Sequence, residues 1–397
     1  MKRLAAFTSF FAIALLCRAQ HATLEVINPT DDFRHEVVAV SADSVQDRVG
    51  GNFRVLEAAG LEIPYQLSHD GLLLIEAAVR PHDTARFTIV AGIPQQFPAV
   101  CHGALHPERK DDFAWENDRG AYRVYGPALG RTKERSYGID VWTKNTPELV
   151  VDDRYYIEDV VMMPRVDSLR RIDRHRGDSL YRLNSYHHDH GRGLDPYKVG
   201  ATLGCGAPAL MLGDSIVMPY VFRECQVLDD GPLRFTAHFV LNKTTVDGDE
   251  IEEHRIIQLD KQSNFNRMTV WYEGLKHPVS FCSGVVIQKE DPKPVVLGKN
   301  FVSYTDPTDQ PRVHQAPLYV AALFPNGPVE TRRHDGHALG IIKNYSGERY
   351  TYYFGSAWSK YDVRTPEEWQ ARIQWYLRSL QQPLQTKLNF KYRSADD

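Results

Sequence analysis

Short segments of alternating apolar and polar residues recur along most of the chain, and they constrain its fold more than any other feature. Segment 233–240 has this pattern, which is typical of a strand with one buried face. Similar segments follow, separated by polar turns, at 256–259, 267–272, 283–288, 319–323 and 350–354. Many short strands without long helices between them favour antiparallel sheets over a parallel α/β sheet. The sequence therefore predicts an all-β protein built on a large antiparallel sandwich.

The first hundred residues form a separate group of predicted strands. These strands are expected at 22–27, 35–40, 72–78 and 85–91, and Pro94 and Pro98 then mark a connector. We therefore expect a small β-sandwich-like unit over residues 20–99 and the main sandwich over residues 100–397.

One helix is well signalled near the C-terminus. Thr365 has the side chain of a helix N-cap, Pro366 suits the first helical position, and Glu368 completes a capping box. Apolar residues then recur at helical spacing, at Trp369, Ile373, Tyr376, Leu377 and Leu380. The pattern predicts a helix from 366 to 381 that packs on the sandwich, followed by a last strand near 384–390.

The N-terminus has the order of a secretory signal peptide. Two basic residues precede a short apolar run at 4–16, and small residues occupy the −3 and −1 positions of a cleavage site after Ala19. The run is shorter than the roughly 20 residues of a transmembrane helix. We therefore expect residues 1–19 to be removed and the protein to be periplasmic or secreted. Lipidation at Cys17 is the less favoured alternative, because Leu16 precedes it rather than a small residue.

Charge and cysteine content exclude several classes of protein. The chain of 397 residues has a net charge of −4, and loss of Lys2, Arg3 and Arg18 with the signal peptide would make it −7. This balance argues against nucleic-acid binding, which normally needs a basic surface. Recognition of an acidic ligand would need a few well-placed cations. The four cysteines after residue 19 form no C-x-x-C pair, so no structural zinc site is indicated.

The stretch 165–195 is rich in arginine and histidine and too polar to bury, so we expect a long functional loop. Its last part contains the densest group of chemically active side chains: Tyr186, His187, His188, Asp189, His190, Asp195 and Tyr197. Histidine exchanges protons near neutral pH, and a nearby aspartate can orient the imidazole ring. His187, Asp189 and His190 also suit a metal ion, but their spacing matches no standard zinc motif. We therefore predict no metal and no cofactor.

A second group of candidate residues lies at 115–127. Trp115 can stack on a sugar ring, Tyr125 can carry a proton, and Asn117, Arg119 and Arg123 can hold a carboxylate. The alternative is a strand with a surface ion pair, such as one between Glu116 and Arg119.

Four motifs resemble the DUF4861 family. They are W-E-N-D-R-x-A-Y-R-x-Y-G-P-A-L at 115–129, G-I-D-V-W at 138–142, Y-H-x-D-H-G-x-G-L-D-x-Y-x-V-G at 186–200 and G-C-G at 204–206. The resemblance implies exported proteins of polysaccharide-degrading bacteria, Bacteroidota in particular, with a β-supersandwich like that of galactose mutarotases. One relative looks like an oligosaccharide dehydratase of ulvan breakdown, which converts a terminal glucuronate into a 4,5-unsaturated sugar. The chain departs from the usual family pattern at Arg192, where relatives often have glutamate.

The residues themselves fit such a β-elimination on an oligosaccharide that contains uronic acid. Arg119, Arg123 or Asn117 would neutralise the carboxylate, and His187 or Tyr125 would take the C5 proton. Tyr186, His188 or His190 would protonate the departing oxygen. Trp115, Asp189, Asp195 and Tyr197 complete the predicted binding residues.

Three alternative functions remain at this point. A polysaccharide lyase would cleave internal bonds by the same elimination. A glycoside hydrolase or epimerase would use carboxylates, such as Glu116 and Asp189. A carbohydrate-binding protein would bind the glycan without reacting.

Overall fold

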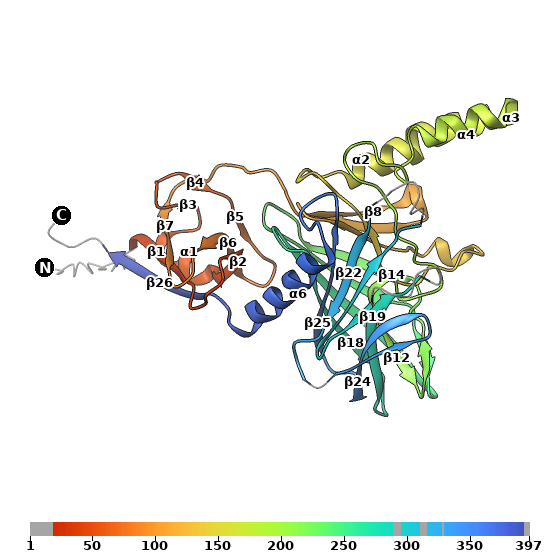
Figure 1. The fold of residues 1–397 in the computed structure, drawn as a ribbon. Coiled ribbons are helices and arrows are strands. Elements are labelled where there is room, and N and C mark those ends of the chain that lie inside the picture. Colours follow the sequence, from red (N-terminus) through yellow and green to blue (C-terminus); the bar gives the residue numbers. More distant parts are fainter. Residues whose placement is uncertain (1–18, 289–294, 310–315, 328, 393–397) are drawn as a thin grey trace, which may run out of the picture.

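Two β-sandwiches of different size make up the molecule (Figure 1). The computed structural model describes residues 19–288, 295–309, 316–327 and 329–392. The predicted signal sequence, apart from Ala19, and its Cys17 lie outside the described residues. Both ends of the described chain lie in the smaller sandwich, because the last strand pairs with the first.

The small sandwich packs two antiparallel sheets around one apolar core. One sheet has the order β26 (Gln385–Tyr392), β1 (Ala19–Ile27), β7 (Thr84–Ala91), β3 (Phe53–Leu56) and β4 (Glu62–Ile63). The other has the order β2 (Arg34–Ser41), β6 (Leu72–Val79) and β5 (Tyr65–Leu67). Helix α1 (Ala42–Val49) adds Val45 and Val49 to the same core. The division of the chain near residue 99 stays a prediction, and β26 joins the sheet of the N-terminal strands.

The large sandwich is built on a nine-stranded sheet. Its order is β14 (Phe222–Asp229), β15 (Arg234–Leu241), β17 (Asp249–Asp260), β18 (Phe265–Glu273), β25 (Tyr350–Trp358), β22 (Leu318–Leu323), β21 (Phe301–Asp306) and β20 (Val295–Leu297), with β16 (Thr244–Val246) beside β17. A five-stranded sheet has the order β13 (Ser215–Val217), β12 (Cys205–Leu212), β19 (Val279–Val286), β24 (His337–Tyr345) and β23 (Glu330–His334).

A four-stranded sheet lies beside the five-stranded one and carries the first sequence motif. Its order is β11 (Asp140–Trp142), β10 (Ala121–Val124), β9 (Asp112–Glu116) and β8 (His102–His106). A bridge between Ile139 and Gly204 connects the two smaller sheets. Residues from all three sheets share one core, including Trp115, Phe235 and Phe281. The two smaller sheets therefore form the layer opposite the nine-stranded sheet.

The C-terminal helix has the predicted bounds. Helix α6 (Pro366–Gln381) begins after Thr365, whose hydroxyl accepts a hydrogen bond from the Glu368 N–H at 3.2 Å. Trp369, Ile373 and Leu377 pack on the nine-stranded sheet. The prediction of an all-β, antiparallel sandwich with a C-terminal helix is confirmed.

The predicted long loop at 165–195 is wrong over its first part, which is helical. Helix α2 (Val151–Tyr155) continues through a π-helical segment (Tyr156–Met162) into α3 (Met163–Ile172), and α4 (Arg174–Arg182) follows. Asp173 caps α4, and Arg170 on α3 pairs with Asp178 on α4 at 2.9 Å. A polar segment can be helical when it stays in solvent and such pairs support it. Accordingly, α3 and α4 project away from the sandwich (Figure 1).

Two further observations concern the described residues as a whole. No helix among them is long and apolar enough to cross a membrane. Cys101, Cys205, Cys225 and Cys282 are all free, and only Cys225 is not fully buried.

Candidate functional site

The outer face of the four-stranded sheet is polar, whereas its inner face belongs to the core. Along β9, Phe113 and Trp115 point into the large core, and Asp112, Ala114 and Glu116 alternate with them. This alternation follows from the two-residue period of a strand. Helix α2 and the segment 183–195 cover the outer face and contribute Tyr155 and Tyr186 to a small apolar cluster there. The face is therefore a buried polar layer between a sheet and its cover.

Arg123 on β10 is the centre of this buried layer. Its guanidinium donates to Asp140 on β11 and, at 2.9 Å, to Asp195 from the second motif. Asp112 lies 3.8 Å away on the other neighbouring strand. The ion pair of Arg123 with Asp195 joins the two sequence motifs that lie 72 residues apart.

The excess of carboxylates around Arg123 changes their proton affinity. Burial, together with the neighbouring charge of Asp195, raises the pKa of Asp140 to about 7. Burial also raises the pKa of Asp112, although Arg123 opposes this shift. One carboxylate of the layer therefore carries a proton at neutral pH and below, and this proton reduces the negative charge around Arg123.

The predicted binding residues of the first motif are engaged with other groups of the protein. Trp115 is 0% exposed, and its indole N–H donates to Asn266 at 2.7 Å. Asn117 donates to the backbone carbonyls of Asp260 and Ser263. Arg119 points away from Arg123, toward Gln262 and toward Asp362 at 3.4 Å. None of these three side chains lines the cavity at the second motif that is described below.

Glu116, the carboxylate of the hydrolase alternative, is also fully paired. One of its oxygens accepts the N–H groups of Val150 and Val151 at the start of α2, and the other accepts Lys144 at 2.5 Å. Both Glu116 and Lys144 are buried. A carboxylate held in this way anchors α2 to the sheet.

Tyr125 and Tyr197 are buried tyrosines of the layer opposite the nine-stranded sheet. The Tyr125 ring lies 5.1 Å from the guanidinium carbon of Arg123. Burial raises the pKa of both hydroxyls well above the usual value of tyrosine. Both hydroxyls therefore keep their protons at neutral pH, which does not favour Tyr125 as a base.

His187 is oriented by the buried layer. Its Nδ1 lies 3.2 Å from the Asp195 carbonyl oxygen and 3.6 Å from the Asp195 carboxylate. A carbonyl oxygen only accepts, so Nδ1 carries the proton of the neutral ring and Nε2 has the lone pair. The side chain is 38% exposed. His187 is thus a histidine held by Asp195, which in turn is held by Arg123.

The turn after His188 brings the remaining residues of the motif into place. Asp189 accepts the N–H groups of Gly191 and Gly193 at 2.9 and 3.2 Å. Gly193 has φ +95°, and a Cβ there would meet the Thr143 carbonyl oxygen at 2.2 Å, so this position requires glycine. His190 donates from Nε2 to the Ser185 carbonyl at 2.9 Å, which leaves its Nδ1 as the lone-pair nitrogen.

A cavity of about 270 Å³ opens between α2, the π-helical segment and this turn. Among the predicted residues, it is lined by Tyr186, His188 and His190. Its volume is near the lower end of the roughly 300–1,000 Å³ typical of small-molecule sites. Another cavity, of about 260 Å³, lies between β2 and α6, and no predicted site residue lines it.

Two arginines line the cavity beside the histidines, and sequence reasoning selected neither as a ligand. Arg154 donates only to backbone carbonyls, those of Thr143 and Arg192. Within the described parts of the chain, no carboxylate lies within ion-pair distance of it, and burial lowers its pKa to about 10. Arg192 pairs with Glu148 at 2.9 Å and is 44% exposed. Arg154 is therefore a charged, partly desolvated cation that lines the cavity, and its nearest acidic neighbours, Glu116, Asp195 and Asp189, act on it from beyond ion-pair distance.

The candidate residues His187, Asp189 and His190 do not form a metal cluster. Within the described residues, one group of histidine and acidic side chains is close enough to share a cation, and it lies on β17 and β18 instead.

Comparisons with known proteins agree with the resemblance of the motifs. The chain is 25% identical to "Uncharacterized protein P7" of Formosa agariphila, over 93% of this chain and 94% of that one. Among solved structures, an alpha-mannosidase from Enterococcus faecalis is similar in fold, with a TM-score of 0.51 and 11% identity. That match covers 96% of this chain and 47% of the mannosidase, so the chain spans about half its length. The model of the DUF4861 family, a "domain of unknown function", matches residues 26–386. The chain therefore belongs to the DUF4861 family.

Proposed function

We propose that the protein is an enzyme of glycan breakdown that eliminates water from a uronate at the non-reducing end of an oligosaccharide. The observation that carries this proposal is the state of Arg154, a charged and partly desolvated guanidinium without a carboxylate partner beside two histidines. A partly desolvated cation with only carbonyl acceptors is suited to receive an anion. A uronate supplies that anion next to an acidic C–H bond.

The arginines and the histidines have distinct roles in the proposed reaction. Arg154 and Arg192 bind the carboxylate and stabilise the negative charge that develops when C5 loses its proton. His190 takes this proton at Nδ1, and the electron pair of the C5–H bond forms the double bond between C4 and C5. The C4–O bond breaks, and His188 protonates the departing hydroxyl, which leaves as water. No redox change occurs, so the step needs no redox cofactor.

His187 and Tyr186 have supporting roles in this proposal. His187 does not line the cavity, and its partner Asp195 belongs to the buried layer, so we assign it to positioning of the turn. Tyr186 is buried, which raises its pKa and keeps its hydroxyl protonated. Its ring stacks on Trp142 at 4.7 Å and forms one wall of the cavity.

The fold relative gives a reason to test carbohydrates first, because it is described as an alpha-mannosidase. The full chain should be incubated with oligosaccharides that end in glucuronate or iduronate and with neutral oligosaccharides. We expect a new ultraviolet absorbance from the conjugated double bond with uronate-ended substrates alone, without shorter products or new reducing ends. Absorbance with shorter products would instead indicate an internal lyase, and new reducing ends without absorbance a hydrolase. If the folded protein binds the panel without any product, the enzyme assignment is wrong.

Single variants test the roles of the two histidines. Proton transfer typically contributes 10²–10⁴-fold to a rate, so we expect His190→Ala and His188→Ala each to lower kcat by about a hundredfold or more. Binding of the oligosaccharide should persist. His187→Ala is the comparison: as a positioning residue it should lower kcat less. Its loss should be partly restored in His187→Asn, which keeps a side-chain donor for Asp195. A larger loss in His187→Ala than in His190→Ala would move the base to His187.

A further inference from the structure

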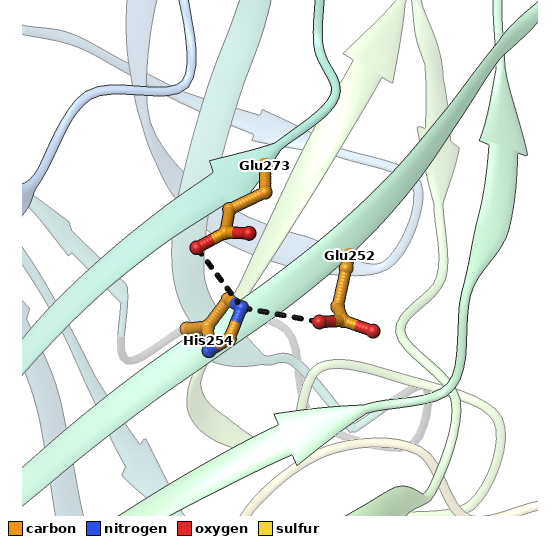
Figure 2. A group of neighbouring side chains, drawn as sticks. All are labelled: Glu252, His254 and Glu273. Atoms are coloured by element: carbon orange, nitrogen blue, oxygen red, sulfur yellow. Dashed lines mark ion pairs between the residues drawn. The ribbon is translucent and has the colours of Figure 1, made fainter.

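The outer face of the nine-stranded sheet carries a second cluster of chemically active side chains, on β17 and β18. Glu252 and His254 are two residues apart on β17 and share one face of the strand. Glu273, at the end of β18, is the register partner of Glu252. Figure 2 shows both carboxylates turned toward the His254 ring. None of these residues lines the cavity at the second motif.

The distances in this cluster suit a shared cation better than hydrogen bonds. The Nε2 atom of His254 lies 3.4 Å from Glu252 Oε1 and 3.5 Å from Glu273 Oε1 (Figure 2). Both exceed the roughly 2.7–3.2 Å of an N–H···O bond. Zinc binds nitrogen and oxygen at about 2.0–2.2 Å, so two ligands of a tetrahedral site lie about 3.3–3.6 Å apart. The ligand atoms of all three residues lie within 4.8 Å of one another.

The burial of His254 supports a cation site independently of the distances. The residue is 9% exposed, and its Nε2 atom has no hydrogen-bond partner, although the ring nitrogen is aimed between the two carboxylates. Buried polar atoms without hydrogen bonds are uncommon and call for an explanation, such as an ion that belongs there.

Neighbouring side chains hold the ligands in this arrangement. His254 Nδ1 lies 3.3 Å from Nε2 of His238, so a proton on Nδ1 can be donated there while Nε2 keeps its lone pair. Trp271 stacks on the His254 ring at 4.7 Å with an interplanar angle of 6°. Arg223 pairs with Oε2 of Glu252 at 2.8 Å, which leaves Oε1 for a cation.

We propose that Glu252, His254 and Glu273 bind a divalent transition-metal ion of the zinc class. Imidazole nitrogen and carboxylate oxygen are both zinc ligands, and a site with three protein ligands keeps its fourth position open to water. Calcium and magnesium prefer all-oxygen sites. The bound ion would cross-link β17 and β18 and offset the repulsion between the two carboxylates, whose oxygens lie within 4.8 Å of each other. The site is independent of the elimination chemistry proposed above.

Titration of the metal-free full chain with zinc chloride tests the site by calorimetry and thermal unfolding. We expect one zinc ion per chain, an increase in Tm, and weaker binding of calcium. Glu273→Gln and His254→Gln should each weaken zinc binding at least tenfold and remove the increase in Tm. Glu273 is 64% exposed, so its variant should fold normally.

Glu250→Gln is the matched control, because Glu250 is an exposed glutamate of β17 that pairs with Lys243. This variant should bind zinc like the parent chain. The proposal is overturned if the parent chain binds no zinc, or if Glu273→Gln and His254→Gln bind it as tightly as Glu250→Gln does. Equal or tighter binding of calcium would overturn the zinc-class assignment.

Discussion

Arg123 and Arg154 lie on the same side of the four-stranded sheet, but their partners differ. Arg123 faces three carboxylates within 4.0 Å, those of Asp140, Asp195 and Asp112. Arg154 donates to backbone carbonyls, and no carboxylate of the described residues lies within 4.0 Å of it. The first arginine is a structural element whose charge is compensated inside the fold. The second retains an uncompensated charge at a cavity, which is the arrangement expected of a ligand-binding residue.

The largest effect should come from removal of the compensated cation. Arg123→Met leaves Asp140, Asp195 and Asp112 without their shared partner, and loss of one partner of a buried ion pair typically costs about 3–5 kcal/mol. We expect the free energy of unfolding in urea to fall by about this amount. Arg119→Met is the comparison and should cost less, because Arg119 is 23% exposed and water can replace it. Equal losses would remove the distinction between the two arginines of the motif.

Removal of the uncompensated cation should affect function rather than stability. Arg154→Met is expected to lower kcat/KM for uronate-ended oligosaccharides by about 10²–10³-fold, the usual cost of losing one charge-stabilising donor. Its Tm should change little or rise, because the variant no longer desolvates an unpaired charge. Arg182→Met on α4 makes the same change of charge at an exposed position and should leave kcat/KM unaltered. A large loss of stability in Arg154→Met, with activity retained, would contradict our interpretation.

The carboxylates around Arg123 should make stability depend on pH in a defined direction. The pKa of Asp140 is higher in the folded protein, at about 7, than its ordinary value of 3.8. The folded state therefore binds the proton more tightly, and this contribution to stability decreases as the pH rises from about 4 to about 7. Asp140→Asn, a neutral replacement of similar shape, should show a smaller decrease in Tm over that range. Asp31→Asn, at a side chain that is 98% exposed, is the control and should follow the parent curve.

The smallest effect is expected at Arg192. Its pair with Glu148 is exposed, and such pairs contribute about 0.2–1 kcal/mol. Glu148→Gln frees the Arg192 guanidinium for the substrate, so KM should decrease by less than about fivefold at unchanged kcat. An increase in KM would indicate that Glu148 itself contributes to binding.

The parts of the molecule that sequence predicts well are those with local signals. The cap at Thr365 and the apolar spacing that follows give the bounds of α6, and alternation gives most strands of both sandwiches. Helix α3 has only a short apolar row, Met163, Val166 and Leu169, among charged residues, and α4 is mostly polar, so periodicity does not predict them. The capping aspartate Asp173 is the one local signal that precedes α4.

The candidate site is harder to predict, because the fold decides which of its charged side chains form ion pairs and which do not. The second motif contains His188 and His190, which line the cavity, and their role in catalysis stays a prediction. Arg123 and Arg154 are the same type of residue and differ in their partners. These partners lie on strands and turns up to 72 residues away in the sequence. Sequence reasoning therefore selects Arg123, the paired arginine of the motif, and offers no signal for Arg154, which lies on α2 outside any motif.

The pairing of β1 with β26 has a consequence for how the protein is made. Val26 pairs with Thr386, and Ala22 with Phe390, so the sheet that contains β1 is completed only by a strand that follows the last strand of the large sandwich in the sequence. Until then β1 has an unpaired edge, which is open to other strands. The large sandwich can form from contiguous sequence while the small sandwich is still incomplete. The order in which the two sandwiches become complete is therefore the reverse of their order in the sequence.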